Sequence, residues 1–134
     1  MSDEQTTEGC GPERELAIRT TLLPKDTNPG GTIFGGVILS LIDQAGEIAM
    51  RRINPHRRYV TVAMDKIQFH APVYVGDLIS LYTCGAQVGT TSVSIQVDVL
   101  VERRDRPGSE IRVTEAKVTF VAIGGDNKPI PVRG

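Results

Sequence analysis

Residues 35–51 carry the longest helix-like pattern in the chain. Apolar side chains recur there three and four positions apart, and they fall on nearly every side of the predicted helix. They are Val37, Ile38, Leu41, Ile42, Ala45, Ile48 and Ala49. A helix that is apolar almost all round has to be buried on most of its sides. We therefore expect one central helix, which follows a loop at 24–31 and ends near "NPHRR".

Period-two alternation predicts strands in the rest of the chain. It is clearest at 92–103, where five β-branched residues alternate with Ser94, Gln96 and Asp98. The other predicted strands are 14–23, 58–70, 77–88 and 110–123. Turn residues separate the last four strands, which indicates antiparallel hairpins. The sequence shows no internal repeat and no interdomain linker.

The order of elements predicts an α+β fold. A single, nearly all-apolar helix needs a surface that wraps it, and a curved antiparallel five-stranded sheet provides one. This arrangement, a sheet around one central helix, is called a hotdog. Residues 13–134 are expected to form this single domain, and 1–12, which lack a hydrophobic period, a disordered tail. The edge strands of so small a sheet favour a homodimer as the minimal unit, assembled further into a tetramer or hexamer.

Charge and composition exclude several classes of protein. The net charge of −1 argues against a nucleic-acid partner, which usually requires a basic excess. No charged-then-apolar stretch opens the sequence, and Asp43 interrupts its one long apolar run, so we expect no export signal, no membrane span and no membrane partner. Two cysteines, Cys10 and Cys84, are too few for a disulfide framework. We expect free thiols in a cytoplasmic protein, and no zinc site.

Asp43 is the unusual residue of the central helix. A buried carboxylate without a partner costs several kcal/mol or more. The helix starts at Gly35 and Gly36, and the seven residues from Gly36 to Asp43 return to nearly the same face, roughly 10–12 Å along the axis. The competing interpretations are a purely structural carboxylate and glycines that only allow close packing of the helix.

Four stretches of the chain carry a resemblance to a known family. They are "LPKDTNPGGTIFGGVILSLIDQAG", "VAMDKIQFHAPVYVGDLI", "VGTTSVSIQVDVLVE", and "VTEAKVTFVAI" followed by "DNKPIPV". Together they span roughly residues 16–132 and resemble the hotdog-fold acyl-CoA thioesterases, in particular the cytosolic acyl-CoA hydrolases and their short bacterial relatives. The resemblance implies a hydrolase of fatty acid metabolism that converts acyl-CoA and water to a free fatty acid and CoA, with no cofactor and no metal.

The resemblance also implies roles for individual residues. Asp43 corresponds to the catalytic carboxylate, Asn28 to a second polar group that positions water or substrate, and Gly35, with Gly36 beside it, to the backbone donor at the helix start. Thioester hydrolysis passes through a tetrahedral oxyanion. A helix N-terminus offers free N–H groups and about half a positive charge to stabilise that oxyanion. A carboxylate can activate water or attack the thioester directly.

Further residues are candidates for binding the substrate. Leu39 and Met50 share the face of Asp43 and, with Phe34, are candidates to line an acyl channel. The turn of Val88, Gly89, Thr90, Thr91 and Ser92 is a candidate for contacts to pantetheine or phosphate. A plain hairpin turn explains it equally well. It also lacks the Arg of the commoner "VGRTS" form, just as "NPGG" replaces the commoner "NPNG".

Two alternative functions stay open. One is a non-catalytic acyl-CoA-binding hotdog module that acts as a ligand sensor. The other is a hotdog enoyl-CoA hydratase, because Asp65 and His70 have the Asp-x4-His spacing of those enzymes. On a regular strand, residues five apart lie on opposite faces, so this pair is not expected to converge.

Overall fold

The computed structural model describes residues 9–134 of the chain. Within these residues, helix α1 spans Gly35–Ile53 and a short 3-10 turn, η2, spans Pro24–Asp26. The strands are β1 (Glu15–Thr20), β2 (Arg58–Phe69), β3 (Leu78–Val88), β4 (Ser92–Glu102) and β5 (Glu110–Ile123). The predicted helix and the five predicted strands are all present, with ends that differ by a few residues.

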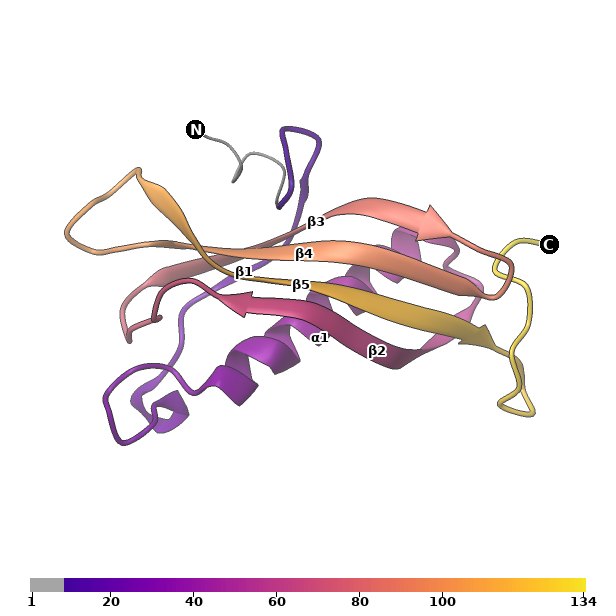
Figure 1. Cartoon of the computed structure of the whole chain (residues 1–134), viewed down its shortest axis with the longest axis horizontal. Coiled ribbons are helices and arrows are strands. Elements are labelled where there is room, and N and C mark those ends of the chain that lie inside the picture. The colour runs from indigo at the N-terminus through magenta and orange to yellow at the C-terminus, as the bar shows by residue number, and fades with distance from the viewer. Residues whose placement is uncertain (1–8) are drawn as a thin grey trace.

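The five strands form one antiparallel sheet in the order β1-β3-β4-β5-β2 (Figure 1). The hairpins β3–β4–β5 form its centre, and β1 and β2 are its two edges. The sheet curves around α1, which crosses one of its faces. The expected α+β arrangement, a curved sheet around one central helix, is therefore confirmed.

Small and branched residues let α1 lie close to the sheet. Ile38, Ile42, Ala45 and Ala49 belong to the buried core together with the inward side chains of the strands. Gly46 faces Phe120 so closely that an added Cβ would come within 2.7 Å of the ring. A glycine is needed at that contact because any side chain would displace the aromatic ring from the core.

Two β-bulges interrupt the edge strand β2. Its register against β5 shifts between Thr61 and Ala63, and again between Asp65 and Gln68. Lys66, in the second bulge, has a φ of 54°, in the left-handed region. The regular alternation that we assumed for Asp65 and His70 is therefore wrong. His70 instead lies 2.8 Å from the Glu115 carboxylate, and no hydrogen bond joins it to Asp65 in the described part of the chain.

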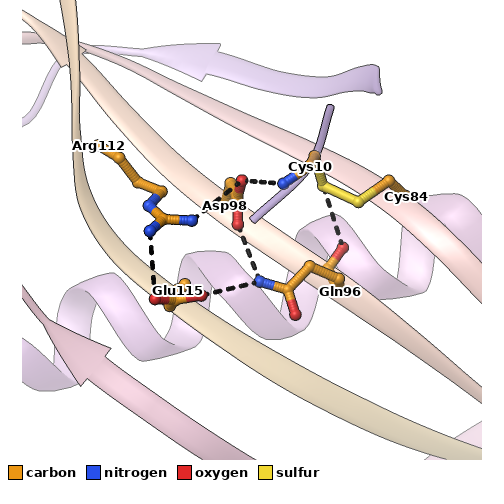
Figure 2. The surroundings of a disulfide bond; sticks show 6 residues. All are labelled: Cys10, Cys84, Gln96, Asp98, Arg112 and Glu115. Atoms are coloured by element: carbon orange, nitrogen blue, oxygen red, sulfur yellow. Dashed lines mark hydrogen bonds and ion pairs between the residues drawn. A yellow bond between two sulfur atoms is a disulfide. The ribbon is translucent and has the colours of Figure 1, made fainter. Parts of the chain in front are cut away.

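The cysteines differ from the prediction of free thiols. Cys10 and Cys84 form a disulfide that ties the N-terminal segment to β3 on the face of the sheet opposite α1 (Figure 2). The Cys10 N–H also donates to the Asp98 carboxylate. Cys10, inside the predicted tail of residues 1–12, is therefore anchored to the sheet, while residues 1–8 lie outside the described structure. The number of cysteines could not predict this bond, because the two residues are 74 positions apart and only the fold brings them together.

Polar side chains under this anchored segment are connected to one another. Asp98 and Glu115 are only 3% and 7% exposed, and the Gln96 amide donates to both carboxylates. Arg112 lies between them, 3.9 Å from Asp98 and 3.5 Å from Glu115 (Figure 2). Buried carboxylates of this kind are tolerated because each has a cationic and a neutral donor.

Candidate active site

Asp43 lies on the side of α1 that the sheet of its own chain does not fully cover. Its Oδ1 atom accepts a hydrogen bond of 2.6 Å from the Thr61 hydroxyl of β2. The carboxylate lines an open hollow of about 500 Å³ with Gln44, Glu47, Ile48 and Arg51. Asp43 is thus a half-buried carboxylate with one neutral donor and access to solvent, an arrangement that allows it to act on a bound molecule.

The start of α1 supplies the second element of the site. Phe34 precedes the helix as its N-cap and gives no side-chain hydrogen bond to the first turn. The first N–H groups of a helix have no acceptor inside the helix. Beside Gly35, the Phe69 ring of β2 lies 3.6 Å from the place a Cβ would occupy. The helix start is therefore an uncapped set of donors with an aromatic ring above it.

Asn28 holds the loop that leads into the helix. Its Oδ1 accepts from the N–H groups of Gly30 and Thr32, and its Nδ2 donates to the Thr32 hydroxyl. Asp26 accepts hydrogen bonds in the same loop, from the Leu23 N–H and from the Lys25 side chain. These two bonds, the first with the larger effect, hold the pKa of the Asp26 carboxyl below its usual value. Asn28 therefore acts as a turn former in the single chain, where its side-chain amide is occupied by its own loop.

The candidate acyl-channel residues are not all accessible. Phe34 is exposed and Leu39 is partly buried against the core, but Met50 is 0% exposed. Seven residues fall about 20° short of two full helical turns, so the face of Asp43 drifts along the helix. The Asn54 amide also holds the C-terminal segment, through the Val132 carbonyl, across this end of α1. Met50 is a core residue in this chain, closed off from solvent, and its place in an acyl channel stays a prediction.

The turn between β3 and β4 lies far from Gly35. It is at the end of the sheet where α1 finishes, opposite the end where α1 begins (Figure 1). The Gly89 N–H donates to the Ser92 carbonyl, and the carbonyls of Thr90 and Thr91 accept from Val132 and Ala122. Val88 pairs with Val93 across the hairpin. Within one chain, this turn acts as a hairpin and does not meet the helix start.

A second hollow adjoins the one beside Asp43. It has a volume of about 430 Å³, shares Glu47 and Arg51 with the first, and is also lined by Arg57, Arg58 and Tyr59. Burial raises the pKa of the Tyr59 phenol, and its hydroxyl has no hydrogen-bond partner within residues 9–134. The hollow is therefore basic, with an unused hydroxyl at its wall.

Comparison with known proteins places this geometry in a family. The sequence model of the thioesterase superfamily matches residues 30–107. Acyl-CoA thioester hydrolase YciA of Salmonella typhimurium is 40% identical over 133 residues, which cover 96% of this chain and 99% of that protein. The chain belongs to the thioesterase superfamily. Its most informative structural neighbour is a hexameric hotdog fold thioesterase of Campylobacter jejuni, with 48% identity and a TM-score of 0.80 over 87% of this chain and 89% of that one.

A second solved structure agrees with the first. The hexameric thioesterase y2039 of Yersinia pestis is 37% identical, with a TM-score of 0.82 over 91% of this chain and 98% of that one. The hotdog fold of this thioesterase is thereby confirmed. No helix of its described residues is long and apolar enough to cross a membrane. Within the same residues, no group of three or more His, Cys, Asp or Glu side chains could hold a metal ion.

Two features of this thioesterase were missed by sequence reasoning. The hydroxyl partner of Asp43 is Thr61, and the ring over Gly35 belongs to Phe69. Both lie on β2, whose bulges determine which side chains face the helix. The alternation of "YVTVAM" points Tyr59 and Thr61 to the same face, so a weak signal for Thr61 existed. No pattern in the sequence indicates the second bulge, on which the position of Phe69 depends.

Proposed function

We propose that this chain hydrolyses acyl-CoA to a free fatty acid and CoA, with water as the second substrate and no separate cofactor. The observation that carries the proposal is Asp43, a carboxylate in the apolar stretch of α1, which Thr61 holds at the edge of an open hollow. The family match and the names of close relatives, acyl-CoA thioester hydrolases, support the same reaction.

The proposed chemistry assigns one role to each polar group. Asp43 takes a proton from water as the water oxygen attacks the thioester carbon, and the carbonyl electron pair moves to oxygen. The N–H of Gly35 donates to that oxyanion, with Gly36 beside it. Collapse of the intermediate expels the CoA thiolate, which takes up the proton. General-base assistance is typically worth about 10²–10⁴-fold.

A nucleophilic Asp43 is the alternative within this mechanism. The carboxylate would then attack the thioester, release CoA and form a mixed anhydride that water cleaves. A single turnover in ¹⁸O-labelled water distinguishes the two routes. Incorporation of label into the Asp43 carboxylate supports the nucleophile, with water attack at the aspartyl carbonyl of the anhydride. Water attack at the acyl carbonyl would label only the fatty acid, so the general base is supported by label only in the fatty acid together with no acyl-Asp43 in mass spectra of the quenched protein.

The proposed site is shared by two copies of the chain. Gly35 and Asp43 are separated by more than two turns along α1, too far apart for one small thioester group unless a partner contributes. The edge strand β2 leaves Val60, Val62 and Phe69 exposed beside the site. We infer that β2 faces a second copy in a homodimer. The solved relatives are hexamers, so we propose a hexamer built from such dimers.

The basic hollow is assigned to the anionic part of CoA. Its arginines lie past Asp43 toward the end of α1, so the phosphates would bind there while the thioester reaches the carboxylate. Arg57 and Arg58 donate to the backbone carbonyls of Pro131 and Gly124. The Arg51 side chain has no hydrogen bond or ion pair within residues 9–134, so it is the arginine we assign to a phosphate contact.

A panel of acyl-CoAs from acetyl to palmitoyl tests the proposal directly. The oligomeric protein is expected to release free thiol continuously from at least one member, with a preference that reports the depth of the acyl channel. Binding of acyl-CoA without thiol release from any member would overturn the hydrolase and support the ligand sensor. Water addition to an enoyl-CoA, with the thioester intact, would support the hydratase.

A cytoplasmic location is part of the proposal, and the disulfide bears on it. Disulfides are rare in the reducing cytosol. Rapid alkylation of thiols in intact cells, followed by mass spectrometry of the peptides that contain Cys10 and Cys84, measures the bond where the protein works. Two alkylated thiols are expected in the cytoplasm, whereas an intact bond would place the protein in an oxidising compartment.

A further inference from the structure

Glu47 is a second carboxylate on the open side of α1. It lies one turn after Asp43 and one turn before Arg51, so the three side chains follow one another along one side of the helix. Glu47 is half-buried, and its side chain makes no hydrogen bond or ion pair within residues 9–134. A half-buried charge without a partner costs free energy. Its position is therefore explained best by a bound molecule that supplies the missing donor.

Glu47 lies where the two hollows beside α1 meet. It lines both the hollow of about 500 Å³ at Asp43 and the basic hollow of about 430 Å³ at Tyr59. Burial raises the pKa of the Tyr59 phenol, the positive charge of Arg57 opposes that rise, and the negative charge of Glu47 adds to it. The charge of Glu47 therefore acts in the second hollow as well as in the first. A molecule that extends from one hollow to the other has to pass Glu47.

The proposed orientation of acyl-CoA brings its pantetheine arm to this point. With the thioester at Asp43 and a phosphate at Arg51, about 12 Å further along the helix, pantetheine spans the distance between them. Two carbons separate the thioester sulfur from the nearer amide nitrogen of pantetheine. That amide N–H is a hydrogen-bond donor, and an ionised carboxylate is an acceptor only. Glu47, about 6 Å past Asp43 along the helix, is an acceptor at the right place for it.

We propose that Glu47 binds the pantetheine amide N–H nearer the sulfur, an inference that rests on the proposed hydrolase. The hydrogen bond fixes how far the substrate enters, so that the thioester carbon reaches Asp43. The same negative charge repels phosphate and keeps the anionic end of CoA at Arg51. Glu47 thereby selects thioesters of pantetheine over thioesters of simple thiols. Hydrogen bonds to a charged group are the stronger ones, so loss of this bond is expected to lower kcat/KM about tenfold.

The test combines truncated substrates with substitutions at Glu47. The substrates share one acyl group and shorten the thiol in steps: acyl-CoA, S-acyl-pantetheine, S-acyl-N-acetylcysteamine, which keeps the nearer amide, and the S-propyl thioester, which has no amide. Glu47→Ala removes the carboxylate, and Glu47→Gln keeps an acceptor oxygen without the charge. The matched control is Glu13→Ala, because Glu13 is exposed, lines neither hollow and has no side-chain hydrogen bond or ion pair within residues 9–134.

The expected pattern separates contact with the amide from a general effect on the site. Glu47→Ala should lower kcat/KM about tenfold for the three thioesters that contain the amide and less than about twofold for the propyl thioester, with Tm and assembly unchanged. Glu47→Gln should show the same selectivity with a loss of about threefold, and Glu13→Ala should stay within about twofold of the parent. Equal losses for all four substrates, or no loss for those with the amide, would overturn the proposal. If Glu47→Ala fails to assemble, the selectivity of Glu47→Gln gives the same decision.

Inhibition by free pantetheine provides a second measurement. Its Ki against acyl-CoA hydrolysis should rise about tenfold in Glu47→Ala and stay within about twofold in Glu13→Ala. An unchanged Ki in Glu47→Ala would overturn the proposal even where the propyl thioester reacts too slowly to measure. If the parent protein hydrolyses no acyl-CoA, the proposed function itself fails. If the parent hydrolyses acyl-CoA and Glu47→Ala behaves like the parent, only the pantetheine contact fails.

Discussion

The two edge strands of the sheet differ in how far the chain itself covers them. β1 is tied to its surroundings by side chains: Arg19 donates to the Ser80 hydroxyl at 2.8 Å, and Arg52 of α1 pairs with Glu15 at 3.0 Å. The segment before β1 is anchored by the Cys10–Cys84 disulfide. β2 is bulged twice and leaves Val60 and Val62 exposed, and it carries Thr61 to Asp43.

The difference indicates that the β1 edge contributes mainly to stability and the β2 edge mainly to catalysis and assembly. An edge closed by ion pairs and a disulfide has little left to offer a ligand or a second copy. An edge with exposed valines, bulges and a carboxylate contact is unfinished in the single chain. Unpaired edges are normally covered or blunted, so an open one calls for a partner. We therefore expect changes at the β1 edge to affect unfolding and changes at the β2 edge to affect assembly and turnover.

The largest effect is expected from Asp43→Asn. Asparagine keeps the shape of the side chain but cannot take a proton from water or attack as a carboxylate. We expect kcat to fall by at least about 10²–10⁴-fold, with KM and Tm little changed. The matched variant on the opposite face of the sheet is Asp98→Asn, which removes the negative charge beside Arg112 and the Cys10 N–H.

Asp98→Asn should show the reverse pattern. Removing the charge of a buried, hydrogen-bonded carboxylate costs about 1–3 kcal/mol of stability. Its Tm should fall while kcat at 25 °C stays within about twofold of the parent. Full turnover by Asp43→Asn in steady-state thiol release would contradict our division of the molecule and would move the chemistry to another group.

The next effect is expected at the exposed face of β2. Val62 is 54% exposed at the first bulge, and Val62→Lys places a charge where we infer the second copy to lie. The dimer should dissociate at micromolar concentration, with at least about tenfold less activity, because charged residues on an edge block pairing. Sedimentation velocity measures the change.

Leu16 provides the control for this substitution on the other edge. It lies on β1 and is 40% exposed. Leu16→Lys should leave both the assembly and the activity intact. Dissociation by Leu16→Lys, with Val62→Lys still assembled, would exchange the roles that we assign to the two edges.

Reduction of the disulfide should be felt mainly in stability. Cys10 and Cys84 are 74 residues apart, and a bond that closes a loop of this size typically contributes about 2–4 kcal/mol to the free energy of unfolding. Cys10→Ser, or a dithiol reductant on the parent, should therefore lower the urea midpoint and leave kcat within about twofold. The reductant should have no effect on Cys10→Ser, and a parent midpoint that ignores the reductant would contradict this account.

The local sequence pattern predicts the central helix and most of the sheet. Period-two alternation at 92–103 indicates a strand and which of its side chains face the core, and the apolar period at 35–51 indicates the helix, because burial imposes those periods directly. Asp43 is visible for the same reason, as a charge inside an apolar period. These features depend on neighbours in the sequence, so the sequence alone predicts them.

The rest depends on chain paths that no local pattern records. A bulge inserts one residue without a change in composition, so the facing of Asp65, Phe69 and His70 could not be read from alternation. The pairing of Cys10 with Cys84 required the N-terminal segment to lie across the sheet. Both features depend on how distant parts of the chain lie against each other: β2 against β5, and Cys10 against Cys84.

The smallest predicted effect compares two adjacent arginines at the end of α1. Arg52 points to the β1 edge, where it pairs with Glu15 and donates to the Leu16 carbonyl. Arg51 points the other way, into the two hollows beside Asp43 and Tyr59. If Arg51 contacts a CoA phosphate at the surface, Arg51→Gln should weaken binding by about 1 kcal/mol, which is about a fivefold rise in KM, with kcat nearly constant. The rise should shrink as salt is added, because exposed charges are screened.

Arg52→Gln carries the same chemical change one residue away and should leave KM unchanged while lowering Tm slightly. Initial rates at several acyl-CoA and salt concentrations measure both variants. An equal rise in KM for the two would mean that general surface charge, and not the hollow on the β2 side, attracts the substrate.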